Sequence, residues 1–171
     1  MSQSDALIAQ YKQLHAQKTY GTTSELQVGY IRRALDDHPG VRSILDYGCG
    51  QSRCVDWLAT LCDAKAYRYD PAIPDYATCP VDQADLVLST DVLEHVPEAD
   101  VPGLLGRMRA ISPHCFLNIA LTEAIEILPN GENAHCTVKP IEWWAAQLRA
   151  HYPKLRRVRS YSAGSISLVT W

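Results

Sequence analysis

Short runs of aliphatic and β-branched residues alternate along this chain with segments whose apolar residues recur at helical spacing. The apolar runs predict strands over residues 41–45, 66–70, 85–89, 115–121, 154–160 and 165–171. The helical spacing predicts helices over residues 5–18, 24–36, 54–61, 100–112 and 141–148. Ser24 and Gln27 are spaced as a capping box for the second of these helices, and Asp100 is placed to cap the fourth. Strands that alternate with helices are typical of an α/β protein with a mostly parallel sheet.

The end of the chain departs from this alternation, because its last two predicted strands follow one another directly. A glycine turn at Gly164 favours a terminal antiparallel hairpin. The basic residues of 154–159 fall on the first of these strands, and no aromatic residues are interleaved with them. We interpret this run as a solvated sheet edge. The predicted fold is a doubly wound, mostly parallel sheet with an antiparallel C-terminal strand.

Composition narrows the class of protein further. The 171 residues predict a single domain, in which residues 1–40 form a helical N-terminal extension. A formal net charge of −3 provides no broad attraction to nucleic acid or anionic lipid. The six cysteines contain no Cys-x-x-Cys pair, so we expect reduced thiols in a cytoplasmic protein. We expect no signal peptide or membrane anchor, because no apolar run is long enough.

The predicted strand 41–45 runs into Asp46-Tyr47-Gly48-Cys49-Gly50 and then into a helix. Glycines let the backbone approach a ligand, and the free N–H groups of the first helical turn point at it. Asp70 ends the next strand, where a carboxylate is placed to accept both hydroxyls of a ribose. A NAD-type site fits less well, because Arg53 stands where a third glycine belongs. The pattern predicts a nucleotide-like ligand.

These two stretches and a third, residues 84–96 (ADLVLSTDVLEHV), resemble the class I S-adenosylmethionine (SAM)-dependent methyltransferase superfamily. The resemblance covers most of the chain and implies a Rossmann-like fold. It implies that SAM is bound by Asp46, Tyr47, Gly48, Cys49, Gly50, Asp70, Pro71, Thr90 and Asp91. The N-terminal extension then becomes a lid whose Tyr11, His15 and Tyr20 line the site, or else a helix that simply packs on the domain.

The chain departs from the family pattern between residues 70 and 84, which are short and rich in proline. This segment has no room for the usual helix and edge strand, so we expect the third strand of the family sheet to be absent. The nearest candidates for contacts to adenine are then Pro71, Ala72 and the turn at Val81 and Asp82.

Candidate catalytic residues gather after the strand 85–89 and in the long connection 122–140. Ligands of open α/β sheets bind at the carboxyl ends of the strands, where both segments map. If residues 92–96 form a helical turn, Asp91, Glu94 and His95 lie on one side of it. His135 lies in the long connection, and loops of this length are usually functional. We therefore predict His135, His95 and Asp91 as catalytic residues.

The spacing of Asp91, Glu94 and His95 also resembles the Glu-x-x-Glu-His signature of two metal-dependent branches of the superfamily. These are the small-RNA terminal 2′-O-methyltransferases and the ubiquinone-pathway O-methyltransferases. The resemblance implies that Asp91, Glu94, His95 and His135 hold Mg²⁺ or Mn²⁺ rather than Zn²⁺. The alternative is that the segment only shapes the SAM pocket and that His135 bonds to backbone.

The predicted function is SAM-dependent O-methylation of a small polar or sugar-like acceptor, such as a small molecule or a glycan. Methyl transfer requires that the acceptor be positioned and that its proton be removed. The negative net charge argues against a nucleic-acid partner. Two alternatives stay open, a SAM-binding regulatory module without catalysis and a metal-dependent RNA ribose 2′-O-methyltransferase.

Overall fold

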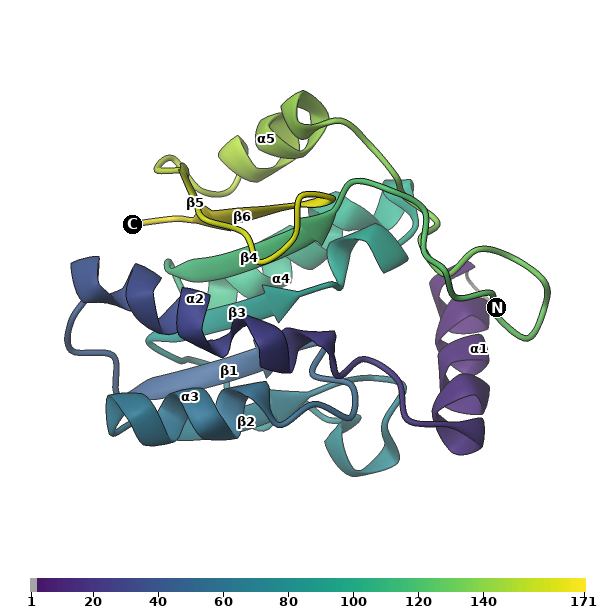
Figure 1. Ribbon diagram of the computed structural model, residues 1–171, viewed down its shortest axis with the longest axis horizontal. Coiled ribbons are helices and arrows are strands. Elements are labelled where there is room, and N and C mark those ends of the chain that lie inside the picture. Colours follow the sequence, from purple (N-terminus) through teal and green to yellow (C-terminus); the bar gives the residue numbers. More distant parts are fainter. Residues whose placement is uncertain (1–2) are drawn as a thin grey trace.

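A six-stranded sheet with helices on both faces forms the body of the molecule, as the computed structural model of residues 3–171 shows (Figure 1). The strands are β1 (Ser43–Tyr47), β2 (Lys65–Tyr69), β3 (Leu86–Thr90), β4 (Cys115–Ala120), β5 (Arg156–Val158) and β6 (Ser165–Val169). Their order is β2-β1-β3-β4-β6-β5. The first four are parallel, and β6 and β5 are each antiparallel to the strand before them in that order. The predicted fold class is confirmed.

The helices fall into two layers and one separate element. The α-helices are α1 (Gln3–Gln17), α2 (Val28–Ala34), α3 (Cys54–Cys62), α4 (Val101–Ile111) and α5 (Ile141–Arg149). Five 3₁₀ turns join them: η1 (Thr23–Gln27), η2 (Leu35–Asp37), η3 (Pro74–Tyr76), η4 (Leu93–His95) and η5 (Glu98–Asp100). Figure 1 shows α2 and α3 in front of the sheet and α4 behind it. No helix of residues 3–171 combines the length and apolar character that crossing a bilayer demands.

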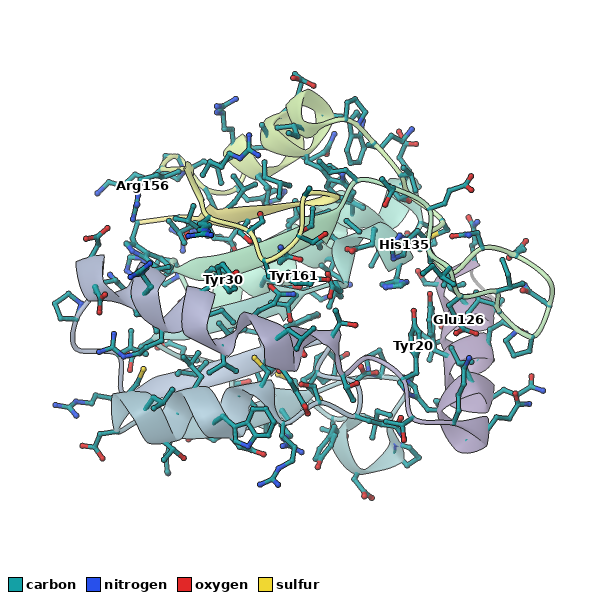
Figure 2. The ribbon with its side chains drawn as sticks, in the orientation of Figure 1. Tyr20, Tyr30, Glu126, His135, Arg156 and Tyr161 are labelled. Carbon is teal, nitrogen blue, oxygen red and sulfur yellow. The ribbon has the colours of Figure 1, made fainter. Side chains whose placement is uncertain are left out.

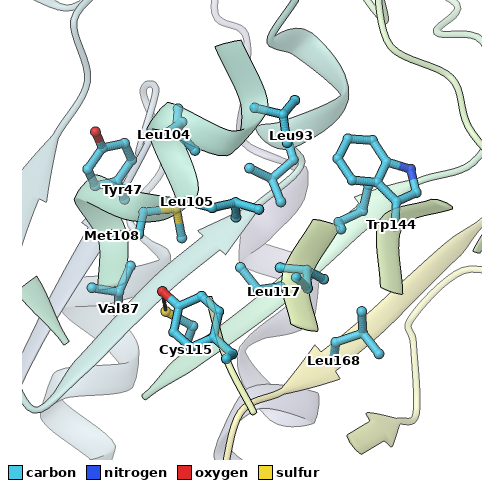
Figure 3. Packing of buried hydrophobic residues seen from close by; sticks show 14 of the residues in the cluster. Tyr47, Val87, Leu93, Leu104, Leu105, Met108, Cys115, Leu117, Trp144 and Leu168 are labelled. Atoms are coloured by element: carbon cyan, nitrogen blue, oxygen red, sulfur yellow. Dashed lines mark hydrogen bonds between the residues drawn. The ribbon is translucent and has the colours of Figure 1, made fainter. Parts of the chain in front are cut away.

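Alternation along the strands supplies the two hydrophobic cores. Successive side chains of a strand point to opposite faces of the sheet, so Ile44 and Leu86 pack with α2 and α3. Leu45 and Val87 point the other way and join the larger cluster with α4 and α5, part of which Figure 3 shows. Fully burying one such side chain stabilises the fold by roughly 1.5–3 kcal/mol. Both faces of the sheet are therefore held by large apolar clusters.

Helix α1 belongs to neither layer. It stands apart from the other helices, beside the carboxyl ends of the parallel strands (Figure 1). Leu14 packs with Leu128 and Ala134 of the 122–140 connection in a third, much smaller cluster. The N-terminal helix is thus attached mainly to the connection that carries His135.

The segment between β2 and β3 holds the turn η3 and no strand, and β2 is the edge of the sheet formed by the described residues. This arrangement agrees with the expected loss of the third family strand. The edge is short, and residues 70–76 are held by backbone bonds such as Asp70 N to Tyr76 O (2.9 Å). The shortened segment therefore turns directly from β2 into the region of the predicted SAM site.

Two local expectations are wrong. Ser24 and Gln27 form no capping box, because α2 begins after the 3₁₀ turn η1. Ser24 donates to Ser52 Oγ (2.7 Å), and the Gln27 amide turns inward instead. Asp100 makes no capping bond to α4 and accepts a hydrogen bond from Ser4. In each case a partner distant in sequence outcompetes the local backbone amide.

Candidate active site

A cavity of about 230 Å³ lies where β1, β2 and β3 end, and α1 covers it. Six of the residues predicted to bind SAM line it: Tyr47, Gly48, Gly50, Asp70, Pro71 and Asp91. The other three, Asp46, Cys49 and Thr90, are buried and lie outside its lining. Ligands of parallel α/β sheets bind at this end of the strands. The structure thus brings most of the predicted cofactor residues together.

The glycine turn after β1 forms the floor of the cavity. Gly48 has a φ of +88°, and a Cβ atom at this position would lie only 2.5 Å from a methyl carbon of Val92. The amides of Gly48 and Cys49 both donate to Tyr69 O, at 2.7 and 3.1 Å. The turn is therefore fastened to β2, and only glycine allows the backbone to approach Val92 this closely.

Asp70, the predicted ribose-binding carboxylate, lines the cavity and is held in place by backbone amides. Its Oδ2 accepts from Gly50 N and its Oδ1 from Ala72 N, each at 2.8 Å. Every carboxylate oxygen has a second acceptor site, so both oxygens remain able to accept a ribose hydroxyl. Pro71 and Ala72 line the cavity beside it, as predicted for adenine contacts, whereas Val81 and Asp82 do not.

Asp46 lies beneath this floor in β1 and is 1% exposed. Neither carboxylate oxygen has a hydrogen-bond partner within residues 3–171. Burial raises the pKa of Asp46 to about 7, and the nearby Arg68 only partly offsets that effect. The predicted role of Asp46 in cofactor binding stays a prediction, since its side chain does not reach the cavity lining.

The acceptor side of the cavity contains a compact group of three predicted residues. One oxygen of Glu94 and one nitrogen each of His95 and His135 lie within 4.8 Å of one another. The two imidazole rings meet edge to face, with centroids 4.7 Å apart. His95 lines the cavity, and Glu94 and His135 adjoin it from outside the lining. We call these three residues the histidine cluster.

Backbone carbonyls determine which ring nitrogens of the cluster are free. His95 Nδ1 lies 2.9 Å from Ala134 O, and His135 Nδ1 lies 2.6 Å from Thr122 O. A carbonyl oxygen can only accept, so both bonds place a proton on Nδ1. Nε2 of each neutral ring is then left with a lone pair that can accept a proton or bind a cation.

Burial sets the charges of the cluster. It raises the pKa of Glu94 to about 8, with a smaller contribution from Asp91, and it lowers the pKa of His95 to about 4. Glu94 Oε1 accepts from Ala120 N at 2.7 Å, whereas Oε2 is buried and has no partner among the described residues. A buried oxygen without a partner is costly, so this group is suited to a proton or a cation supplied from outside.

A divalent cation fits the donor set of the histidine cluster. Two neutral imidazoles and one carboxylate are a common set for a catalytic metal, and such sites leave coordination positions open for substrate. The unpartnered oxygen of Glu94 is the observation that supports this fit. Asp91, the fourth ligand implied by the family signature, lies outside the group.

The backbone explains why Asp91 is separated from the cluster. Asp91 has a φ of +55°, and η4 begins only at Leu93, so residues 91–96 do not form one helical turn. The left-handed conformation, which aspartate tolerates better than most residues, places Asp91 in the cavity lining. Its Oδ2 lies 3.4 Å from Gln27 Nε2, and burial raises its pKa to about 6.

Tyrosines from distant segments complete the surroundings of the cluster. Tyr11, His15 and Tyr20 line the cavity, as predicted for a lid. Tyr11 Oη lies 2.7 Å from His95 Nδ1 and donates to Ala134 O at 2.8 Å, which ties α1 to the cluster. Figure 2 shows Tyr20, His135 and Tyr161 pointing toward the same region from three different segments. Burial, together with Asp91 and Glu94, raises the pKa of Tyr161 to about 12.

Three residues of this site had no signal in the sequence. Gln27 was assigned to a helix cap, Tyr161 lies in the turn before β6, and Arg107 lies among the residues of α4. Arg107 lines the cavity, and its Nε lies 3.5 Å from Tyr47 Oη. Only the packing of the chain brings these residues to the site.

A comparison with protein-family models matches residues 23–167 to the family described as methyltransferase domain. The chain belongs to this family. It is a class I SAM-dependent methyltransferase, as the glycine turn and Asp70 predicted. The match includes the floor of the cavity and the histidine cluster, whereas all of α1 precedes it. A comparison with curated protein sequences finds no match.

Solved structures of other methyltransferases share the fold. The 1,6-didemethyltoxoflavin-N1-methyltransferase of Burkholderia thailandensis, bound to its substrate and S-adenosylhomocysteine (SAH), has a TM-score of 0.58 at 18% identity, over 86% of this chain and 76% of that one. The magnesium protoporphyrin IX methyltransferase of Synechocystis PCC 6803, bound to SAM, has a TM-score of 0.57 at 16% identity, over 85% of this chain and 77% of that one. Mitomycin 7-O-methyltransferase has a TM-score of 0.62 at 15% identity, over 84% of this chain and 53% of that one.

At these identities the similarity establishes the fold alone. This methyltransferase spans about half the length of the mitomycin enzyme. One of the three neighbours is named for an N1 acceptor and one for an O acceptor, so the shared fold serves different acceptor atoms. The acceptor must therefore be inferred from the site itself.

Proposed function

We propose that this methyltransferase transfers the methyl group of SAM to a hydroxyl oxygen of a small polar or sugar-like acceptor. The observation that carries the proposal is the histidine cluster, because it presents two unprotonated imidazole nitrogens beside the cavity. A hydroxyl is a poor nucleophile until its proton is removed, so a base at this position is what O-methylation needs.

The proposed reaction is a single in-line displacement. The acceptor oxygen bonds to the methyl carbon while the sulfur–carbon bond breaks, and the electron pair of that bond stays on the sulfur of SAH. The hydroxyl proton passes to Nε2 of His135. His95, with a pKa lowered to about 4, is too weak a base to keep that proton, so it serves to orient His135 across the 4.7 Å between the rings.

Geometry also supports a role for the lid in this step. His135 is half-buried and its Nδ1 is tied to Thr122 O, so its free nitrogen is held in a fixed direction. Tyr11 Oη accepts from His95 Nδ1, and burial raises the pKa of Tyr11, so its hydroxyl stays protonated and donates to Ala134 O. The acceptor is thus enclosed by groups from α1 and from the 122–140 connection.

A divalent cation would be held by Glu94, His95 and His135, and the free nitrogen of His135 would then serve as a ligand in place of acting as the base. The cation would supply a Lewis acid that lowers the pKa of an acceptor hydroxyl. Because two of the three donors are imidazole nitrogens, the set suits Mn²⁺ better than Mg²⁺. Asp91 is not needed as a ligand for the cation. It lines the cavity, and in the proposed site it contacts the bound acceptor.

The test combines SAH binding with methyl transfer. We expect His135→Ala to bind SAH within about threefold of the wild type in calorimetry but to lose roughly 100-fold or more in transfer to a panel of polyol and sugar acceptors. A heat of Mn²⁺ binding that disappears in the same variant supports the cation. The control is His151→Ala, which removes a half-buried histidine outside the cavity. Unchanged transfer by His135→Ala would refute the proposed base, and SAH binding without transfer in the wild type would favour a regulatory module.

A further inference from the structure

A second hollow lies between α2 and β5, outside the cofactor cavity. Its walls carry three exposed arginines, with Arg33 on α2 and Arg156 and Arg159 on and after β5. Tyr30 is half-buried between them, and Asp37 is the single carboxylate among the described lining residues. We call this hollow the arginine groove.

Only one of the three arginines is neutralised. Arg156 Nη2 lies 3.1 Å from Asp37 Oδ2. The ion pairs formed within residues 3–171 involve neither Arg33 nor Arg159. The Arg159 guanidinium lies over the Tyr30 ring, 5.9 Å from its centroid. Two guanidinium groups that form no ion pair within residues 3–171 therefore line the groove, one from each wall, in a chain whose formal net charge is −3.

Both walls of the groove lead to the active site. On the α2 side, Gln27 contacts Asp91, and Arg33 follows it by six residues, roughly 9 Å along a helix. On the β5 side, Arg159 is two residues from Tyr161. The charges of Asp91 and Glu94 contribute to the raised pKa of Tyr161, so this tyrosine lies near the active site. Figure 2 shows Tyr161, Tyr30 and Arg156 in succession from the centre of the molecule toward its upper left.

We propose that the arginine groove binds the diphosphate of an acceptor whose sugar hydroxyl reaches the histidine cluster; this inference rests on the proposed function. Guanidinium groups match phosphate oxygens in a bidentate fork, and two of them on opposite walls match the two phosphates of a diphosphate. The substrate class is a sugar diphosphate or a nucleotide-linked sugar.

The experiment is a calorimetric titration of inorganic pyrophosphate into the full chain saturated with SAH. Three proteins are compared: the wild type, the double variant R33Q/R159Q, and the matched control R32Q/R157Q. Arg32 is next to Arg33 but pairs with Asp36, and Arg157 points to the other face of β5 from Arg156. The control therefore removes the same charge from neighbouring positions of the same two segments, at residues that do not line the groove.

We expect the wild type and the control to bind pyrophosphate with similar affinity, and R33Q/R159Q to bind it about tenfold or more weakly, since charge-assisted hydrogen bonds are lost. Binding should weaken as salt is added. Equal losses in both double variants, or no binding by the wild type at millimolar pyrophosphate, would overturn the proposal. So would a single-stranded RNA oligonucleotide that displaces pyrophosphate and binds far more tightly, because the groove would then serve nucleic acid.

The proposal and the proposed function fail in different ways. The pyrophosphate titration does not depend on methyl transfer, and the transfer assay of His135→Ala does not depend on pyrophosphate. If the pyrophosphate results are as expected while His135→Ala transfers normally, the groove stands and the base is wrong. If His135→Ala loses transfer while pyrophosphate does not bind, the base stands and the diphosphate acceptor is wrong.

Discussion

The floor and the roof of the cavity are built in different ways. The floor is the glycine turn and Asp70, whose contacts run through backbone amides of neighbouring strands. The roof is α1 and the 122–140 connection, which meet through a small apolar cluster and the bonds of Tyr11. The cofactor side is thus anchored to the main core, whereas the acceptor side depends on a few side-chain contacts between distant segments.

The largest expected effect comes from beneath the floor, where Asp46 is buried without a partner. A pKa raised from 3.8 to about 7 corresponds to on the order of 4 kcal/mol. The folded state holds this proton more tightly than the unfolded chain, so the free energy of unfolding falls as the pH rises from about 4 to about 7. Asp46→Asn should remove this part of the pH dependence.

Urea unfolding of both proteins across that pH range measures the effect. Asp75→Asn is the control, because Asp75 is exposed in η3. A wild type that gains stability relative to Asp46→Asn between about pH 4 and about pH 7 would contradict the prediction, because Asp46 would then be ionised in the folded protein.

The next effect separates steric crowding from backbone strain in the floor. Gly48→Ala places a Cβ against Val92 and also forces a side chain into positive φ, so we expect a loss of about 3 kcal/mol in unfolding free energy and of SAH binding. Gly40→Ala shares the strain, with a φ of +91°, but meets no atom within 4 Å. It should cost only about 1 kcal/mol and leave SAH binding unchanged. Similar results for the two variants would mean that crowding by Val92 is unimportant.

A weaker effect is expected in the roof. Leu14→Ala removes a buried side chain from the small cluster with Leu128 and Ala134. We expect about 2 kcal/mol of local destabilisation, seen as faster amide exchange in residues 3–21, with little change in global unfolding. Leu58→Ala in the core under α2 and α3 should instead lower global stability by about 3 kcal/mol. Equal effects on global unfolding would show that α1 is part of the main cooperative unit.

The smallest effect tests the hydrogen bonds of the Tyr11 hydroxyl, which join α1 to the histidine cluster. Tyr11→Phe removes the hydroxyl near His95 Nδ1 and Ala134 O, and we expect about a tenfold lower transfer rate with SAH affinity nearly unchanged. Tyr20→Phe is the matched control, because Tyr20 also lines the cavity while its hydroxyl makes no hydrogen bond within residues 3–171. A rate loss shared by both variants would assign the effect to the cavity surface rather than to His95.

The sequence alone predicted the parts of this protein that depend on local physics. Strand alternation determines which faces Ile44 and Leu45 bury, and the order of strands and helices determines the sheet class. Gly48 and Asp70 were recognised because a turn that approaches a ligand needs glycine and because the next strand end adjoins it. These features involve residues close in sequence or in adjacent strands, so pattern and spacing suffice to find them.

Local patterns failed where a distant partner was available. Gln27 fits a helix cap by spacing, yet its amide contacts Asp91 and Asn118. Asp91 fits a metal-ligand signature by spacing, yet its left-handed conformation separates it from Glu94 and His95. Spacing along the chain does not specify φ at one residue or the competition between hydrogen-bond partners.

Tertiary structure alone decided how the acceptor side is assembled. Tyr11, His95 and His135 come from three segments that meet only when α1 and the 122–140 connection pack together. The basic run of β5 was correctly predicted to be a solvated edge, but its partners Arg33 and Tyr30 belong to α2. Contacts of this kind form between side chains that are remote in sequence, and their geometry is set by packing, which no local pattern records.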